Sequence, residues 1–187
     1  MASASEPPDI MTLSIPDLLA CATTHKLKLG EIPLGLLQPA GITSVLQFQT
    51  LVTSDNAISI RTVAPQSVLM LMAQLKAGNT GQSNFFVRVK YVQVTEEVHG
   101  FVKSTYGADY VRSEGNTKAG TKKYLVSIYD VFDGNHRITA YLRLIKDGHQ
   151  TLKLTTLVSA QIYKESLPVV ACSRLADIAN EMQVTPT

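Results

Sequence analysis

The clearest pattern along the chain is an alternation of apolar and polar side chains that begins at Phe85. Val87 and Val89 continue the apolar parity, whereas Arg88 and Lys90 occupy the opposite one. Successive side chains of a β-strand point to opposite faces of the sheet. The pattern therefore predicts a strand with one apolar face and one cationic face.

Three further apolar runs follow, separated by short turn sequences. The runs cover residues 122–132, 136–146 and 150–163, and the turns cover 133–135 and 147–148. Both turns contain Asp-Gly, which is typical of β-hairpins because glycine accepts the positive φ that a tight turn requires. We expect an antiparallel meander of three strands here.

Four segments show the capping residues of short helices. The expected helices begin after Ser14, Ser67, Thr95 and Ser173, and the first ends near His25. Serine and threonine are favoured before a helix because the hydroxyl accepts a hydrogen bond from an amide of the first turn. In the later three segments apolar residues recur three or four positions apart, which gives each helix one face to bury.

The remaining segments predict a hairpin and two loops. Residues 44–52 and 57–63 are β-branched or apolar, and a turn-forming sequence at 53–56 separates them. Residues 29–43 contain glycine or proline too often for a regular element, and residues 112–121 have almost no aliphatic side chain. We expect mobile loops in both places.

These elements together predict one α+β domain over residues 14–184, preceded by a flexible arm at residues 1–13. We expect a mainly antiparallel, twisted sheet of about five to six strands, with about three to four short helices packed on it. The chain has 187 residues, of which 45% are hydrophobic and 17% charged. That composition supplies enough apolar material for a single core.

The sequence favours a cytoplasmic protein, with the virion or a peripheral membrane site as more specific alternatives. The longest apolar runs fall well short of the roughly 20 residues that cross a bilayer, and the first residues do not match a secretory signal. The two cysteines, Cys21 and Cys172, lie among small or apolar residues, where cysteine usually behaves as a buried hydrophobe.

No motif in the sequence indicates catalysis, a metal or a cofactor. The four histidines lie tens of residues apart without the spacing of metal ligands, and no nucleophile elbow surrounds a serine or cysteine. Asp130 falls on an apolar strand parity, where burial would raise its pKa. The favoured interpretation is structural: it bonds a turn or pairs with a cation such as Arg137. We expect neither a cofactor nor a small-molecule substrate.

The positive signal is a cationic surface. Residues 82–164 carry 12 Lys and Arg against 7 Asp and Glu, although the whole chain has a net charge of only +2. If the later strands bury their aliphatic parity, the opposite parity displays cations interleaved with tyrosines: Arg88, Lys90, Arg137, Arg143 and Lys153, with Tyr129 and Tyr141. A second cluster lies in and beside the loop at 112–121: Lys118, Lys122 and Lys123. Such cations bind phosphates of RNA or lipid headgroups; the alternative is a solvated face without a partner.

The order of these features resembles the matrix proteins of rhabdoviruses, in particular the small ones of the plant-infecting cytorhabdovirus group. The resemblance covers residues 84–183 and rests on two strands, Phe85 to Tyr91 and Tyr124 to Asp130, followed by a meander and a closing helix. The arm contains Pro7-Pro8 without the tyrosine of the Pro-Pro-x-Tyr budding motif that many members carry. The resemblance implies a non-enzymatic protein that self-associates, coats a nucleocapsid and contacts the inner leaflet of a membrane.

Three functions are therefore open at this point. The first is a viral structural, matrix-like protein that bridges its own copies, nucleoprotein-RNA and an anionic membrane through the cationic surface, with the arm or the 29–43 loop supplying self-contact. The second is a viral accessory protein that binds nucleic acid, such as a silencing suppressor or a movement factor. The third is an enzyme whose site is assembled only in three dimensions.

Overall fold

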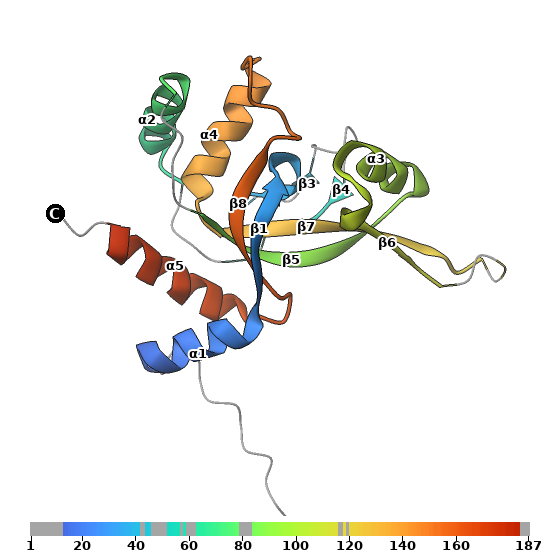
Figure 1. Cartoon of the computed structure of the whole chain (residues 1–187), viewed down its shortest axis with the longest axis horizontal. Coiled ribbons are helices and arrows are strands. Elements are labelled where there is room, and N and C mark those ends of the chain that lie inside the picture. The colour runs from blue at the N-terminus through green and yellow to red at the C-terminus, as the bar shows by residue number, and fades with distance from the viewer. Residues whose placement is uncertain are drawn as a thin grey trace, which may run out of the picture.

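The protein has an α+β fold, which confirms the predicted class (Figure 1). The computed structural model describes residues 13–41, 44–45, 52–56, 58, 63–78, 84–115, 118 and 120–183. Within these residues it contains five α-helices, a mixed, mostly antiparallel six-stranded sheet and a separate two-stranded sheet. Residues 1–12 of the predicted arm lie outside the described residues.

The helices and strands have the following bounds. The α-helices are α1 (Ile15–His25), α2 (Pro65–Lys76), α3 (Glu96–Tyr106), α4 (Asn135–Lys146) and α5 (Val169–Gln183), and the 3-10 turns are η2 (Leu34–Leu36) and η3 (Ala108–Tyr110). The strands are β1 (Lys26–Pro33), β2 (Leu37–Gln38), β3 (Ser44–Val45), β4 (Val52–Thr53), β5 (Phe85–Val94), β6 (Val111–Glu114), β7 (Lys123–Asp133) and β8 (Leu157–Tyr163).

The main sheet has the strand order β1-β8-β5-β7-β2, and β6 pairs with the first four residues of β7. β5 lies at its centre, antiparallel to β7 and parallel to β8. β1 is antiparallel to β8, and the two residues of β2 are parallel to β7. The sheet therefore ends in a long edge strand, β1, on one side and a very short one, β2, on the other.

Helices cover both faces of the sheet. Phe85 and Val87 belong to the larger core cluster, together with residues of α2, α3 and α4, whereas Phe86 packs against a second cluster formed with α1 and α5. Because successive strand residues point to opposite faces, these clusters lie on opposite sides of the sheet. We call these sides the α4 side and the α5 side; Figure 1 shows α2 and α4 together, apart from α1 and α5.

The helix starts follow the predicted capping chemistry. The Ser14 Oγ accepts a hydrogen bond from the Asp17 amide, and the Thr95 Oγ1 accepts one from the Val98 amide, each at 3.3 Å. Helix α2 begins two residues before Ser67, because Pro65 already has the φ of a first helical residue. Helix α5 begins directly after Pro168 rather than after Ser173.

The predicted strand at 136–146 is wrong, because these residues form α4. Its buried positions include Ile138, Tyr141 and Leu144, a spacing of three that suits a helix facing a sheet. Gly134, with φ of +102°, is the residue before the helix rather than the tip of a hairpin. A side chain there would meet the Phe85 ring, with Cβ only 2.5 Å from Cδ1. The predicted three-strand meander is therefore interrupted, and β8 pairs with β1 and β5 instead of with β7.

The predicted loop at 29–43 is also wrong over much of its length. It contains the end of β1, then η2 and β2, and it buries four aliphatic side chains: Ile32, Leu34, Leu36 and Leu37. Pro33 is tolerated because it is the last residue of an edge strand, where a missing amide hydrogen costs little. Gly35 is required by packing, since a Cβ there would overlap the Tyr106 hydroxyl.

Three other predicted segments differ in extent. The first residues of the predicted loop at 112–121 belong to β6. The predicted strand at 150–163 begins only at Leu157. β3 pairs with β4, so residues 44–45 are antiparallel partners of residues 52–53, although 44–52 was predicted as one strand. Most of the predicted second hairpin strand, 57–63, lies outside the described residues. The predicted strand at 122–132 is confirmed as β7.

Candidate functional site

The predicted cationic sheet face does not exist as one surface, and α4 is the first reason. Arg137 is buried, with its guanidinium carbon 3.9 Å from the centre of the Phe85 ring. Burial lowers the pKa of Arg137, while nearby Tyr141 and Asp133 oppose that shift. Tyr141 and Tyr129 are buried as well, so neither ring can stack on a base or lie among headgroups. The helical periodicity of α4 turns Arg137 and Tyr141 toward the sheet, whereas Tyr129 is buried as part of β7.

Arg88 and Lys90 do lie on one face of β5, but other segments cover that face. Lys90 Nζ lies 3.0 Å from Asp130 Oδ1 and donates to the Asp55 carbonyl at 2.5 Å. Arg88 Nη1 donates to the Leu167 carbonyl at 2.8 Å, just before α5. Both cations therefore satisfy groups of the protein itself rather than an external anion.

Asp130 is the acidic partner of this group, in place of the predicted pairing with Arg137. It is 1% exposed, and the Lys90 contact is an ion pair without the angles of a hydrogen bond. Burial raises the pKa of Asp130, while Lys90 and, to a smaller degree, Arg88 oppose the shift. Because the carboxylate is enclosed between strands and covering segments, we interpret it as structural. The Arg88 Nε is also buried and finds no partner among the described residues.

A neighbouring amide network holds the covering segment in place. The Asn56 Nδ2 donates to the carbonyls of Gln38 and Val131, at 3.0 and 3.1 Å. The Ser54 hydroxyl donates to the Gln38 Oε1 at 3.1 Å. The sequence analysis placed Ser54 and Asn56 in a turn and Gln38 in a loop, and no signal in the sequence showed that these residues cover β7.

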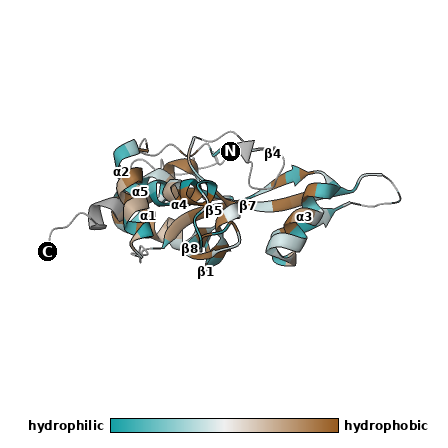
Figure 2. Cartoon of the chain, turned by 90° about the horizontal axis from the view of Figure 1, so that it is seen from above, coloured by the Kyte–Doolittle hydropathy of each residue, from teal (hydrophilic) through white to brown (hydrophobic). Residues whose placement is uncertain are grey.

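The cations that do reach the surface lie in separate places. Arg143 is exposed on α4, and Lys153 is exposed in the segment before β8. Lys118, Lys122 and Lys123 are exposed as well, beside the outer end of β7. We call residues 111–115 and 121–124 the β6–β7 arm; Figures 1 and 2 show it projecting from the body of the molecule.

The β6–β7 arm combines cations with tyrosine rings. The Arg112 guanidinium carbon lies 3.7 Å from the centre of the Tyr91 ring, and the Lys122 Nζ lies 5.4 Å from that of Tyr124. Both distances are those of cation–π contacts. This is the closest counterpart in the structure to the predicted surface of cations and aromatic rings, but it is built from different residues.

Helix α2 carries an exposed apolar surface that the sequence interpretation missed. Val68 and Leu75 are buried against α4, whereas Leu69 and Met70 are 58% and 64% exposed. The helix contains one charged residue, Lys76, in its last turn. The run of five apolar residues from 68 to 72 was the available signal, because it is too long for one buried helix face and so places apolar side chains on the outer face as well.

Helix α4, which packs against α2, carries two exposed cations, Arg143 and Lys146. On α4, Arg143 shares one helical line with His136 and Asp147, which are seven and four residues away. His136 Nε2 accepts from the Ala64 amide at the start of α2, and Asp147 lines a cavity with Lys76 at its end. Arg143 therefore flanks α2. We call Leu69, Met70, Lys76, Arg143 and the exposed Lys146 the α2 surface.

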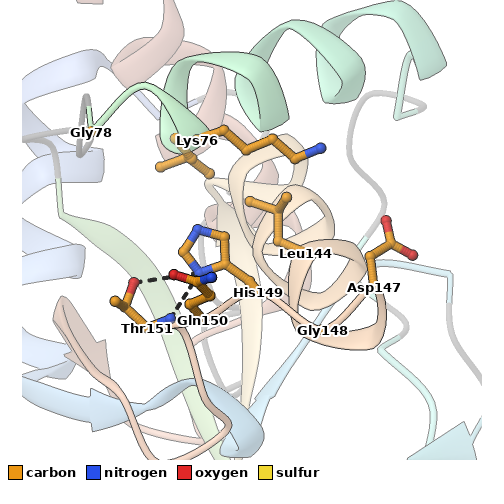
Figure 3. Close-up of a pocket in the computed structure, with 9 residues that line it drawn as sticks. Lys76, Gly78, Leu144, Asp147, Gly148, His149, Gln150 and Thr151 are labelled. Atoms are coloured by element: carbon orange, nitrogen blue, oxygen red, sulfur yellow. Dashed lines mark hydrogen bonds between the residues drawn. The ribbon is translucent and has the colours of Figure 1, made fainter.

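The cavity between the ends of α2 and α4 has a volume of about 480 Å³ (Figure 3). The His149 Nδ1 accepts from the amides of Thr151 and Leu152, at 3.2 and 3.1 Å, so its ring proton lies on Nε2. Lys76 and Asp147 contribute opposite charges to the lining. Within the part of the chain that the structure describes, no three His, Cys, Asp or Glu side chains are grouped to hold a metal ion.

The outer edge of β1 is a further exposed feature. Residues 26–29 and Glu31 are exposed, and a bulge interrupts the pairing with β8 between Lys26 and Lys28. Two of the exposed residues, Leu27 and Leu29, are large and apolar. The sequence interpretation placed part of this segment in a loop and did not identify a sheet edge.

No family model, curated protein or solved structure matches this chain. The resemblance to rhabdovirus matrix proteins therefore stays a prediction from the sequence. Among the described helices, none combines the length and the apolar character needed to cross a membrane. Cys172 is buried as expected, with its thiol pKa raised by burial to about 12, whereas Cys21 is only half-buried.

Proposed function

We propose that this chain is a non-enzymatic structural protein of the viral matrix type, which associates with itself and bridges nucleoprotein-RNA and an anionic membrane. The α2 surface is the membrane contact in this proposal. The observation that carries it is the pair of adjacent exposed apolar side chains, Leu69 and Met70, on a helix flanked by exposed cations. The β6–β7 arm is assigned to the nucleoprotein-RNA.

The chemistry of the α2 surface suits a bilayer interface. A helix of 12 residues lies in the interface plane, where Leu69 and Met70 reach the boundary of headgroups and acyl chains. Near a negatively charged leaflet, a lysine or arginine contributes about 1 kcal/mol of attraction. Lys76, Arg143 and Lys146 supply such charges, and Asp147 at the end of α4 opposes them in part.

Vesicle flotation tests this assignment. We expect the protein to float with vesicles that contain phosphatidylserine and to remain at the bottom with vesicles of phosphatidylcholine alone. The double variant Leu69→Ser/Met70→Ser and the double variant Arg143→Glu/Lys146→Glu should each reduce flotation by about tenfold.

Leu157→Ser is the matched control, because Leu157 is a similarly exposed leucine on β8 rather than on α2. It should float like the unmodified protein. Equal flotation of all variants, or equal flotation with both vesicle compositions, would contradict the membrane assignment of the α2 surface.

A second candidate function, nucleic-acid binding as an accessory protein, is supported by the β6–β7 arm. Its lysines can neutralise phosphates, and Tyr124 of the arm and Tyr91 of the adjacent β5 offer rings on which bases stack. Binding to a short single-stranded RNA should weaken steeply with added salt. Lys122→Glu/Lys123→Glu should weaken it further at every salt concentration, whereas Lys28→Glu on β1 should have a smaller effect. RNA binding by a protein that ignores anionic vesicles would favour this function over the matrix type.

A further inference from the structure

The long edge strand of the main sheet is exposed. β1 stands last in the strand order, and among the described residues only β8 pairs with it. Figure 2 shows β1 at the margin of the molecule. Leu29 on this strand is 59% exposed. The unpaired backbone donors and acceptors of an edge strand can bind another strand.

The register with β8 shows which side chains share a face at this edge. Lys26, Leu29 and Glu31 are opposite Tyr163, Gln161 and Ser159, which alternate along β8 and therefore point to the same side. Tyr163 packs in the cluster with α1 and α5, so this is the α5 side. The bulge at Leu27 is the reason that Lys26 joins this face, because one extra residue reverses the parity.

We propose that two copies of this chain pair through β1, antiparallel and around a two-fold axis at Leu29, so that their sheets become continuous. In this register each Leu29 lies opposite the Leu29 of the other copy, which buries the most exposed apolar side chain of the strand. Glu31 lies opposite the other copy's Leu27 and next to its Lys26, which the bulge brings to the same face. The two-fold axis creates this opposite-charge contact twice.

The α4 side of the edge fits the same register. Lys28 lies opposite Gly30 of the other copy. Within one chain the Lys28 stem already lies against Gly30, where a Cβ would be 3.5 Å from the Lys28 Cε. A glycine opposite a lysine leaves room for the stem to lie flat while the ammonium group reaches water.

The pairing closes after two copies. The opposite edge of the sheet is divided between β2, which has two residues, and β6, which has four, so it offers only short segments for further strand addition. Lysines and a bulge are features that discourage indefinite edge pairing, and β1 has both. The inference rests on the self-association in the proposed function and identifies the strand that provides it.

Charge substitutions at the two-fold axis test this register. In the dimer, Leu29→Glu places two carboxylates opposite each other and Leu29→Lys places two ammonium groups opposite each other. Each variant alone should raise the dimer dissociation constant by about tenfold or more. An equimolar mixture should form the mixed dimer, because position 29 then pairs opposite charges. Sedimentation equilibrium over a concentration series, with one variant fluorescently labelled, measures both quantities.

Leu19→Lys is the matched control, because Leu19 is a leucine that is 47% exposed on α1, outside β1 and outside the α2 surface. It should dimerise like the unmodified protein, and circular dichroism should show the same fold for all variants. An unmodified protein that stays monomeric at all concentrations would contradict both the self-association and this interface. A dimer that Leu29→Glu leaves intact, or variants whose mixture stays monomeric, would overturn the β1 pairing alone.

Discussion

Two regions of this protein, the middle of β5 and the β6–β7 arm, both combine cations with a tyrosine in the sequence. Their cations differ in burial and in the groups that they contact. On β5, Lys90 is paired with Asp130, and Arg88 bonds the Leu167 carbonyl. On the β6–β7 arm, Arg112 lies over the exposed Tyr91 ring, at the protein surface. Strand parity predicts the face to which a side chain points, but the coverage of that face depends on segments far away in the chain.

The difference matters for function because a paired, buried cation is unavailable to a partner. A lysine whose side chain is 16% exposed and bound to a carboxylate has already exchanged water for protein contacts. A lysine at the outer end of β7 keeps its hydration and can exchange counterions for phosphates on contact. Substitutions in the two regions should therefore affect different properties, namely stability on β5 and binding on the arm.

The largest expected effect follows from removing the cation of the buried pair. Lys90→Met leaves the Asp130 carboxylate enclosed without its partner, and we expect the free energy of unfolding to fall by about 3 kcal/mol. The double variant Lys90→Met/Asp130→Asn should recover most of that loss, because no buried charge remains. Urea unfolding of the two variants measures this difference. Lys123→Met on the arm should stay within about 0.5 kcal/mol of the unmodified protein.

A smaller effect concerns the pH dependence of stability. Because burial raises the pKa of Asp130 in the folded protein, the folded state binds this proton more tightly than the unfolded state does. The contribution of Asp130 is then fully present below its unfolded pKa and is lost as the pH rises through its folded pKa. Stability should fall over this window by at most about 1.4 kcal/mol per pH unit from this group.

Urea unfolding at a series of pH values, for the unmodified protein and for Asp130→Asn, isolates this contribution. The pKa of Asp133 is also raised by burial, but that carboxyl is present in both proteins and cancels in the comparison. Identical pH profiles would mean that Asp130 titrates alike in the folded and unfolded states. A profile that rises with pH relative to Asp130→Asn would mean that Lys90 outweighs burial.

The smallest effect is expected at the surface of the arm. Arg112→Ala removes an exposed cation–π contact with Tyr91 and an exposed ion pair with Glu114 at 3.2 Å. Contacts of this kind contribute about 0.5 kcal/mol, because water and salt screen both groups. Thermal unfolding should show a shift of a few degrees at most. A loss comparable to that of Lys90→Met would show that the arm is part of the cooperative core.

Local signals account for the parts of the fold that the sequence predicted well. Ser14 and Thr95 cap helices, and each cap needs only a hydroxyl and a backbone amide three residues later in the chain. The alternation that begins at Phe85 predicted β5, because buried apolar residues on one face of a strand alternate with polar residues on the other face. The α4 segment failed because Ile138 and Leu144 fit a period of two together with Leu142, and also a helical spacing together with Tyr141. Packing against the sheet and α2 resolved that ambiguity.

The candidate surfaces divide in the same way. The sequence by itself determined which residues carry charge and which are apolar, and hence that Lys122 and Lys123 lie beside a turn and that α2 has few polar positions. Only the tertiary structure decided that Asp130 neutralises Lys90, that α4 turns Arg137 inward and that β1 ends the sheet. The physical reason is that burial and strand order depend on contacts between distant segments, and the local sequence contains no record of which segments will cover it.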